Sequence, residues 1–173
     1  MLGVEVSKVV LLPHDEDWSN QFKIKKEELI KILGDNIVEI HHIGSTAIKG
    51  IVAKPILDIA IVVKDICSLM KEMEAVGYEL VMQREPGRYC FSKLNNNDID
   101  THHVHCFLEN HEKFRIMVLF CKFLNENTEY AKKYNDLKIE LAKKYPDDRN
   151  LYGEGKSEFI NMIINLIKRK NIL

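Results

Sequence analysis

The stretch IGSTAIKGIVAKPILDIAIVV, residues 43–63, decides the fold. Its second half, residues 56–63, is a nearly continuous run of aliphatic and β-branched residues, which is typical of a central strand covered on both faces. Its first half begins at Gly44, which leaves an expected strand at residues 37–43 and can adopt a backbone conformation closed to other residues. A glycine turn followed by a buried strand predicts a place where a ligand can approach the main chain.

Asp58 is the sole charged residue within residues 56–63. Burying a carboxylate in an apolar strand is costly unless the group is paired, hydrogen-bonded or metal-bound. Because Asp58 stands near the start of its strand, we expect it to emerge at the sheet edge beside Gly44. Ser45 and Thr46 offer hydroxyl and N–H groups at what would be the start of a helical turn, and such a turn attracts phosphate.

Lys49 and Lys54 add positive charge to the same loop, so two interpretations are open. In the first, the loop holds phosphates and Asp58 holds Mg²⁺, which is what metal-assisted nucleotidyl transfer requires. In the second, a Ser or Thr hydroxyl caps an ordinary strand-to-helix turn, while Asp58 caps the loop's amides or pairs with Lys54.

The rest of the chain predicts a small mixed sheet flanked by helices. Further strands are expected at residues 78–83, 88–94 and 101–108, and helices are expected before Gly34, at residues 66–76, from residue 112 onward, before Pro146 and at residues 157–168. We therefore expect one α+β domain over residues 1–173, in which residues 111–173 form a C-terminal group of about three helices.

The composition indicates no broad class of macromolecular partner. The chain has 25 basic and 26 acidic residues, so a net charge of -1 favours neither nucleic acid nor a membrane surface. No apolar run approaches the ~18 residues of a membrane helix, and we expect no signal peptide. Four cysteines without a C-x-x-C pair favour free thiols in a reducing cytosol. We expect a cytoplasmic protein.

Histidines add a third interpretation. His103 and His105 share one face of the strand expected at residues 101–108. With His41 or His42 on a neighbouring strand, they could form a metal site or a phosphate-binding cluster. No cysteine or carboxylate lies at a recognised zinc spacing, so polar residues that merely face a cleft are the alternative.

Residues 43–58 resemble the signature of the GrpB family, which is assigned to the nucleotidyltransferase superfamily and also occurs fused to bacterial dephospho-CoA kinases. The likeness extends over most of the chain, through residues 12–22, Gly77-Tyr78, His103-Val104-His105, residues 134–138, Tyr152 and Lys156.

This resemblance implies an α+β nucleotidyltransferase-like fold that binds a nucleotide or another phosphorylated small molecule. Gly44 and Ser45 take the phosphate-loop positions, and Asp58 takes the first metal-carboxylate position, with Mg²⁺ as the implied cofactor. The full set of expected roles is phosphate binding by Gly44, Ser45, Thr46, Lys54, His103 and Lys156, and catalysis by Ser45, Asp58 and His105, the last by polarising the acceptor.

The chain departs from the superfamily pattern at several positions. Ala60 stands where enzymes usually carry a second carboxylate, residues 120–124 lack an Arg-Asp pair, and Lys49 replaces a common proline. Asp98 and Asp100 would supply a carboxylate if they reached the cleft, but after three asparagines we expect them on a solvated turn.

Three functions therefore stay open. The first is nucleotide binding with Mg²⁺-dependent nucleotidyl transfer. The second is a non-catalytic binding or accessory module on the same fold, which Ala60 favours. The third is a histidine-based metal hydrolase.

Overall fold

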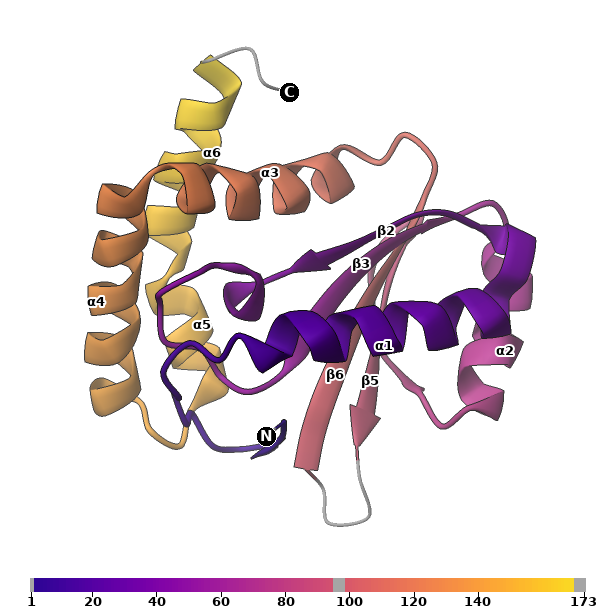
Figure 1. Cartoon of the computed structure of the whole chain (residues 1–173), viewed down its shortest axis with the longest axis horizontal. Helices are drawn as coiled ribbons and strands as arrows, with labels where there is room; N and C mark the ends of the chain where they lie inside the picture. The colour runs from indigo at the N-terminus through magenta and orange to yellow at the C-terminus, as the bar shows by residue number, and fades with distance from the viewer. Residues whose placement is uncertain (1, 95–98, 170–173) are drawn as a thin grey trace.

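Six strands and six α-helices make up the part of the chain that the computed structural model describes, residues 2–94 and 99–169 (Figure 1). The strands are β1 (Val4–Glu5), β2 (Ile37–Ile43), β3 (Leu57–Val63), β4 (Glu79–Glu85), β5 (Arg88–Leu94) and β6 (Ile99–Leu108). The helices are α1 (Asp17–Leu33), α2 (Ile66–Ala75), α3 (Glu112–Glu126), α4 (Thr128–Lys144), α5 (Arg149–Gly155) and α6 (Ser157–Arg169).

The strands form one mixed sheet in the order β2-β3-β6-β5-β4, with β1 paired to β6. The pairing of β3 with β6 is parallel, and the other pairings are antiparallel. In the β3–β6 register Asp58 lies opposite His103 and Ala60 lies opposite His105. Because alternate residues of a strand face alternate sides, these four side chains share one face of the sheet. The predicted mixed α+β fold is confirmed.

The other face of the sheet is buried under α1 and α2 (Figure 1). Ile59 and Ile61 of β3 and Val104 of β6 point to this side and pack with Leu29 of α1 and Leu69 of α2. All five side chains are fully buried, which removes a large apolar area from water. This layer leaves the Asp58 face free to carry polar groups.

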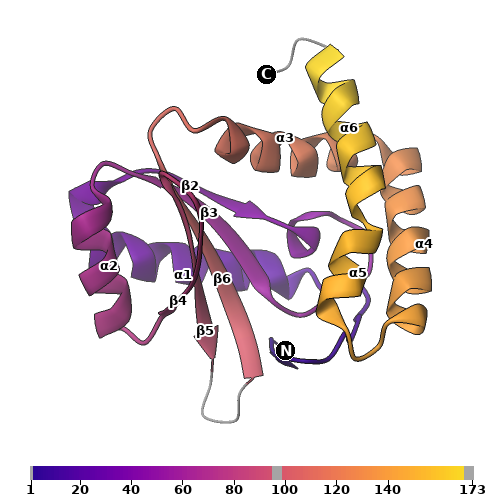
Figure 2. The same cartoon turned by 180° about the vertical axis from the view of Figure 1, so that it is seen from behind.

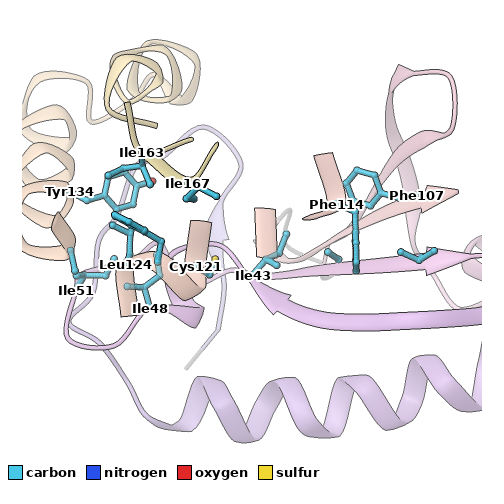
Figure 3. Close-up of a cluster of buried hydrophobic side chains, with 14 residues drawn as sticks. Ile43, Ile48, Ile51, Phe107, Phe114, Cys121, Leu124, Tyr134, Ile163 and Ile167 are labelled. Carbon is cyan, nitrogen blue, oxygen red and sulfur yellow. The ribbon is translucent and has the colours of Figure 1, made fainter. Parts of the chain in front are cut away.

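The Asp58 face is covered at one end by the C-terminal helices (Figure 3). Ala60 and Phe107 of the sheet belong to the same apolar cluster as Leu124 of α3, Tyr134 of α4 and Ile163 of α6. Those helices therefore stand as a wall beside the polar part of the face (Figure 2).

Helix α5 is an element that the sequence pattern did not anticipate. Its two glycines, Gly153 and Gly155, have low helix propensity and mask the pattern. Asp148 stabilises its start, because one carboxylate oxygen accepts hydrogen bonds from the N–H groups of Asn150 and Leu151, both at 2.9 Å. No helix in the described ranges is long and apolar enough to cross a membrane.

Replacing Ile163 by Ala should lower the free energy of unfolding by about 2–5 kcal/mol, because the side chain is fully buried between α6 and the sheet. Met162→Ala is the matched control, since the side chain of Met162, the residue before Ile163, is 41% exposed. Urea denaturation measures both variants. Equal losses would contradict the packing of α6 against α3 and α4.

Candidate phosphate-binding site

Gly44 and Asp58 pack directly against each other at the start of β3. Gly44 has φ of 70° and ψ of -171°, a conformation that is essentially confined to glycine. A Cβ atom at this position would lie 2.3 Å from Oδ2 of Asp58. The β2–β3 register places Ile43 opposite Asp58, so the strand ends bring the turn and the acid together.

Two histidines hold the carboxylate of Asp58. His103 donates from Nδ1 to Oδ1 of Asp58 at 3.3 Å, and from Nε2 to Oδ2 of Asp100 at 2.9 Å. His105 donates from Nε2 to the same Oδ1 at 3.4 Å. A ring that donates from both nitrogens is a protonated imidazolium, so His103 carries a positive charge between two carboxylates.

The pKa values of these groups follow from the same contacts. Burial lowers the pKa of His103, but the hydrogen bonds that the ring donates to Asp100 and Asp58 outweigh it and raise the pKa to about 10. For His105, burial is likewise outweighed by Asp58 and Cys90, and the pKa rises to about 9. Burial alone would raise the pKa of Asp58, whereas the two histidines hold it far below its ordinary value. Asp58 is therefore an ionised carboxylate.

Asp100 does not lie on a solvated turn, which corrects the expectation from its neighbouring asparagines. Only 3% of Asp100 is exposed, because the residue is part of β6 and its carboxylate is enclosed. Ser92 donates to Oδ1 at 3.0 Å, and Arg149 of α5 donates to Oδ2 at 2.8 Å. Asp98 lies outside the described residues.

A cavity of about 220 Å³ opens between this carboxylate and the C-terminal helices. We call it the phosphate cavity, and its lining residues are Gly44, Ser45, Lys54, Ile56, Asp58, His103, Phe120, Tyr134, Tyr152 and Lys156. Segments that are far apart in sequence, the loop after β2, the strand β6 and helices α3 to α5, therefore converge on one small space.

Lys54 and Lys156 are the exceptional groups of the phosphate cavity. Each lies over the ring of Tyr152, at 5.9 Å and 4.3 Å from its centre, and neither forms an ion pair with any described residue. Burial lowers the pKa of Lys156 to about 8, with a further contribution from Lys54. Burial and the charge of Arg149 lower the pKa of Lys54. The cavity thus contains two cations that form no close ion pair within the described chain, although the charge of Asp58 in the same lining attracts both.

The remaining predicted site residues are placed differently. Thr46 is buried, and its hydroxyl bonds to Nε2 of His42 at 3.0 Å and to the carbonyl of Ile56 at 3.4 Å, so it braces the loop. The loop after Gly44 is a three-residue 3-10 turn rather than an α-helical turn. Lys49 is exposed and does not line the cavity. His105 lines a neighbouring pocket.

The donor set does not form a preassembled metal centre. Within residues 2–94 and 99–169, no group of three His, Cys, Asp or Glu side chains is arranged to hold a metal ion. His42 stacks on Phe22 on the opposite face, and burial lowers its pKa to about 4. His41 contacts Glu39 and Phe114. The structure therefore keeps both of these histidines apart from His103 and His105.

Lys138 of α4 is a buried cation that the sequence analysis did not assign to the site. It is 1% exposed, donates to the carbonyl of Val52 and lies 5.0 Å from the centre of the Tyr134 ring. Burial and the charge of Lys156 lower its pKa to about 7. The sequence contained a signal for this burial. Lys138 follows Tyr134 by four residues and precedes Leu141 by three, so all three lie on one face of the helix.

The strand order and the turn that faces Asp58 define a nucleotidyltransferase-like fold. Cid1 poly(U) polymerase bound to MgATP superposes with a TM-score of 0.51 at 13% identity, over 77% of this chain and 44% of that chain. At this identity the likeness concerns the fold alone. The chain belongs to the GrpB family, whose model, "GrpB protein", matches residues 8–166.

Similar proteins carry the same family name or no functional name. Glutamate-rich protein GrpB of Alkalihalophilus pseudofirmus is 37% identical, over 95% of this chain and 99% of that protein. UPF0157 protein YqkA of Bacillus subtilis is 36% identical over 94% of this chain, which spans 48% of YqkA. The crystal structure of conserved protein GrpB from Enterococcus faecalis has a TM-score of 0.86 at 30% identity, over 95% of this chain and 100% of that one. The predicted family resemblance is confirmed.

Gly44→Ala should destabilise the protein more than Gly50→Ala. Both glycines have positive φ, so both variants carry backbone strain of roughly 1–3 kcal/mol. Only at Gly44 does the new methyl group meet the Asp58 carboxylate, whereas nothing lies within 4 Å at Gly50. Urea denaturation of the two variants isolates this contact. Equal destabilisation would show that Gly44 and Asp58 are not packed together.

Lys138 should make the protein more stable as the pH rises from 7 to 10. Its pKa falls from 10.5 in the unfolded chain to about 7 in the folded one, so the unfolded chain binds more protons in this window. The free energy of unfolding then increases with pH, by up to about 1.4 kcal/mol per unit. Denaturation curves of Lys138→Met should have a shallower slope, to which only Lys54 and Lys156, whose pKa values are also lowered, still contribute. Lys143→Met, at an exposed position of α4, should keep the full slope. A slope in Lys138→Met as steep as that of the wild type would show that Lys138 does not contribute.

Proposed function

We propose that the phosphate cavity binds the phosphate groups of a nucleotide or of another phosphorylated small molecule. The observation that carries this proposal is the pair of lysines, Lys54 and Lys156, that lie in the cavity without an ion-pair partner among the described residues. Burying a charge without a partner is costly, and this cost is reflected in their lowered pKa values. A bound anion would relieve it.

The size and shape of the cavity support phosphate rather than a whole nucleotide as its content. Its volume of about 220 Å³ is below the ~300–1,000 Å³ of pockets that enclose drug-sized ligands. A nucleoside attached to the phosphates would extend out of it. Ser45 lines the cavity beside Gly44, so its hydroxyl is available to the same phosphates.

The residues of the cavity fit one Mg²⁺ ion that enters bound to the ligand's phosphates. They do not fit a site for two metal ions. Ala60 removes the second carboxylate, and Oδ1 of Asp58 is taken by two histidines. Oδ2 faces Gly44 and accepts no hydrogen bond within the described ranges, so it could join phosphate oxygens around one ion. When bound there, Mg²⁺ would neutralise charge on the phosphates.

Nucleotidyl transfer is the reaction that the fold and the site support best. An acceptor oxygen forms a bond to the α-phosphorus, the bond from that phosphorus to the bridging oxygen breaks, and pyrophosphate leaves. The acceptor's proton passes to bulk water, because the strongly lowered pKa of Asp58 makes its carboxylate a poor base. Lys54 and Lys156 balance the charge of the departing pyrophosphate, and His105 donates a hydrogen bond that orients the acceptor.

A non-catalytic binding module is the second candidate, because Ala60 leaves a single carboxylate on β3. The module would hold the same phosphates without turnover. For either function we propose a cytoplasmic location, since all four cysteines are free thiols and suit a reducing compartment.

Lys156→Gln should weaken ATP binding at least about tenfold, because the variant removes one of the two half-buried cations that line the cavity. In the wild type, affinity should fall as the pH rises above about 8, where free Lys156 loses its proton. Titration calorimetry at pH 7 and pH 9.5 measures both effects. Lys132→Gln, at an exposed position of α4, is the control and should bind as the wild type does. Equal affinities in all three proteins would overturn the assignment.

Pyrophosphate release from ATP, UTP, GTP and CTP distinguishes transfer from binding in the same samples. Release that requires Mg²⁺ and is abolished by Asp58→Asn would support the transferase. Tight binding without release, under conditions with and without EDTA, would support the non-catalytic module.

A further inference from the structure

Lys156 is a half-buried amine at the junction between two helices. It follows Gly155, the last residue of α5, and precedes Ser157, the first residue of α6. Its backbone N–H donates to the carbonyl of Gly153 at 3.2 Å, and its side chain lines the phosphate cavity. Its Nζ atom lies over the ring of Tyr152, 4.3 Å from the ring centre. The junction and the ring therefore hold this nitrogen inside the cavity.

The surroundings of Lys156 favour the neutral amine over the ammonium ion. Three aromatic side chains line the same cavity: Phe120, Tyr134 and Tyr152. Burial and the charge of Lys54 lower the pKa of Lys156 to about 8, although Asp58 acts in the opposite direction. About half of the Lys156 side chains are then unprotonated at pH 8, whereas less than ~1% are for a lysine with the ordinary pKa of ~10.4. Desolvation and a neighbouring cation are the means by which proteins activate lysine nucleophiles.

Lys54 is placed to hold a phosphate beside this amine. It lies over the same Tyr152 ring, 5.9 Å from its centre, and it forms no close ion pair with a described residue. Lys54 and Lys156 thus face one space of about 220 Å³. In an acyl phosphate, a single oxygen joins the phosphorus to the carbonyl carbon. Such a molecule, with its phosphate at Lys54, would have its reactive carbon close to the Lys156 amine, which favours reaction between them.

We propose that Lys156 is a modification site, at which acyl phosphates transfer their acyl group to the ε-amine. The amine nitrogen forms a bond to the carbonyl carbon, and the bond from that carbon to the bridging oxygen breaks. The phosphate leaves with the electron pair of the broken bond and takes up the proton that the nitrogen loses. The products are an uncharged amide at Lys156 and inorganic phosphate.

Acylation would remove one of the two cations of the phosphate cavity. This consequence rests on the proposed function, because it means that the acylated protein binds its phosphorylated ligand more weakly. The acylation itself does not depend on which ligand the cavity holds at other times. The same site would then respond to the supply of acyl phosphates through a covalent change.

Acetyl phosphate is the probe, and peptide mass spectrometry follows the acetylation of each lysine over time at pH 8. We expect Lys156 to react at least about tenfold faster than Lys132, an exposed lysine of α4 in the same sample. Methyl phosphate, which carries a phosphate but no acyl group, should slow the reaction at Lys156 and leave Lys132 unchanged. Equal rates at the two lysines, or a rate at Lys156 that methyl phosphate does not lower, would overturn the proposal.

Two lysines that are close in sequence provide the matched variants. Lys54→Gln removes the group that holds the phosphate and a charge that disfavours protonation of Lys156, so acetylation of Lys156 should slow about tenfold. Lys49→Gln makes the same change at an exposed position that does not line the cavity, and it should leave the rate unchanged. Equal rates in two folded variants would contradict the role of Lys54. If Lys54→Gln does not fold, protection of the wild type by methyl phosphate tests the same capture of phosphate.

Titration calorimetry with ATP separates this proposal from the nucleotide proposal. Protein acetylated at Lys156 should bind ATP at least about tenfold more weakly than unmodified protein does. Equal affinities would refute the effect of the modification on binding. Selective acetylation of a protein that binds no ATP would refute the nucleotide proposal alone. ATP binding without selective acetylation would refute the modification site alone.

Discussion

The ionised carboxylate of Asp58, partly buried at the start of β3, is the constraint on which the rest of the site depends. One oxygen lies against the backbone of Gly44, and the other accepts hydrogen bonds from His103 and His105. A carboxylate that is only 28% exposed loses part of its hydration, and the charged donors offset that loss. His103 in turn needs Asp100 on its other nitrogen, and Asp100 needs Arg149. A chain of alternating charges therefore runs from the middle of the sheet to α5.

His103 lies between two spaces on this face of the sheet, because it lines both the phosphate cavity and a pocket of about 740 Å³ over β4, β5 and β6. On the side of the C-terminal helices, one oxygen of Asp58 is bound by histidines, and Lys54 and Lys156 form no ion pair with a described residue. On the side of β4 and β5, Asp100 is bound by His103 and Arg149, and Asp147 is paired with Lys8. The alternating charges therefore reach both spaces.

The local sequence pattern was sufficient to predict the sheet and the contact between Gly44 and Asp58. The apolar run of β3 and the glycine before it are adjacent in sequence, so the turn geometry follows from short-range rules. Asp100 was misjudged because three asparagines precede it, whereas its burial depends on Arg149, 49 residues away. The absence of a partner for Lys54 and Lys156 is likewise a long-range property. Composition cannot reveal which charges will find counterions once helices pack.

The phosphate cavity is lined by segments that are far apart in sequence, and this has a consequence during synthesis of the chain. Its walls include Gly44 in the first third of the chain and Lys156 in the last third. When the ribosome has released the sheet alone, the cavity is incomplete, because Tyr152 and Lys156 are synthesised only with α5 and the residue that follows it. Under the proposed function, a ligand would therefore stabilise only chains that extend through Lys156, and a chain that is cut before this residue would gain no such protection.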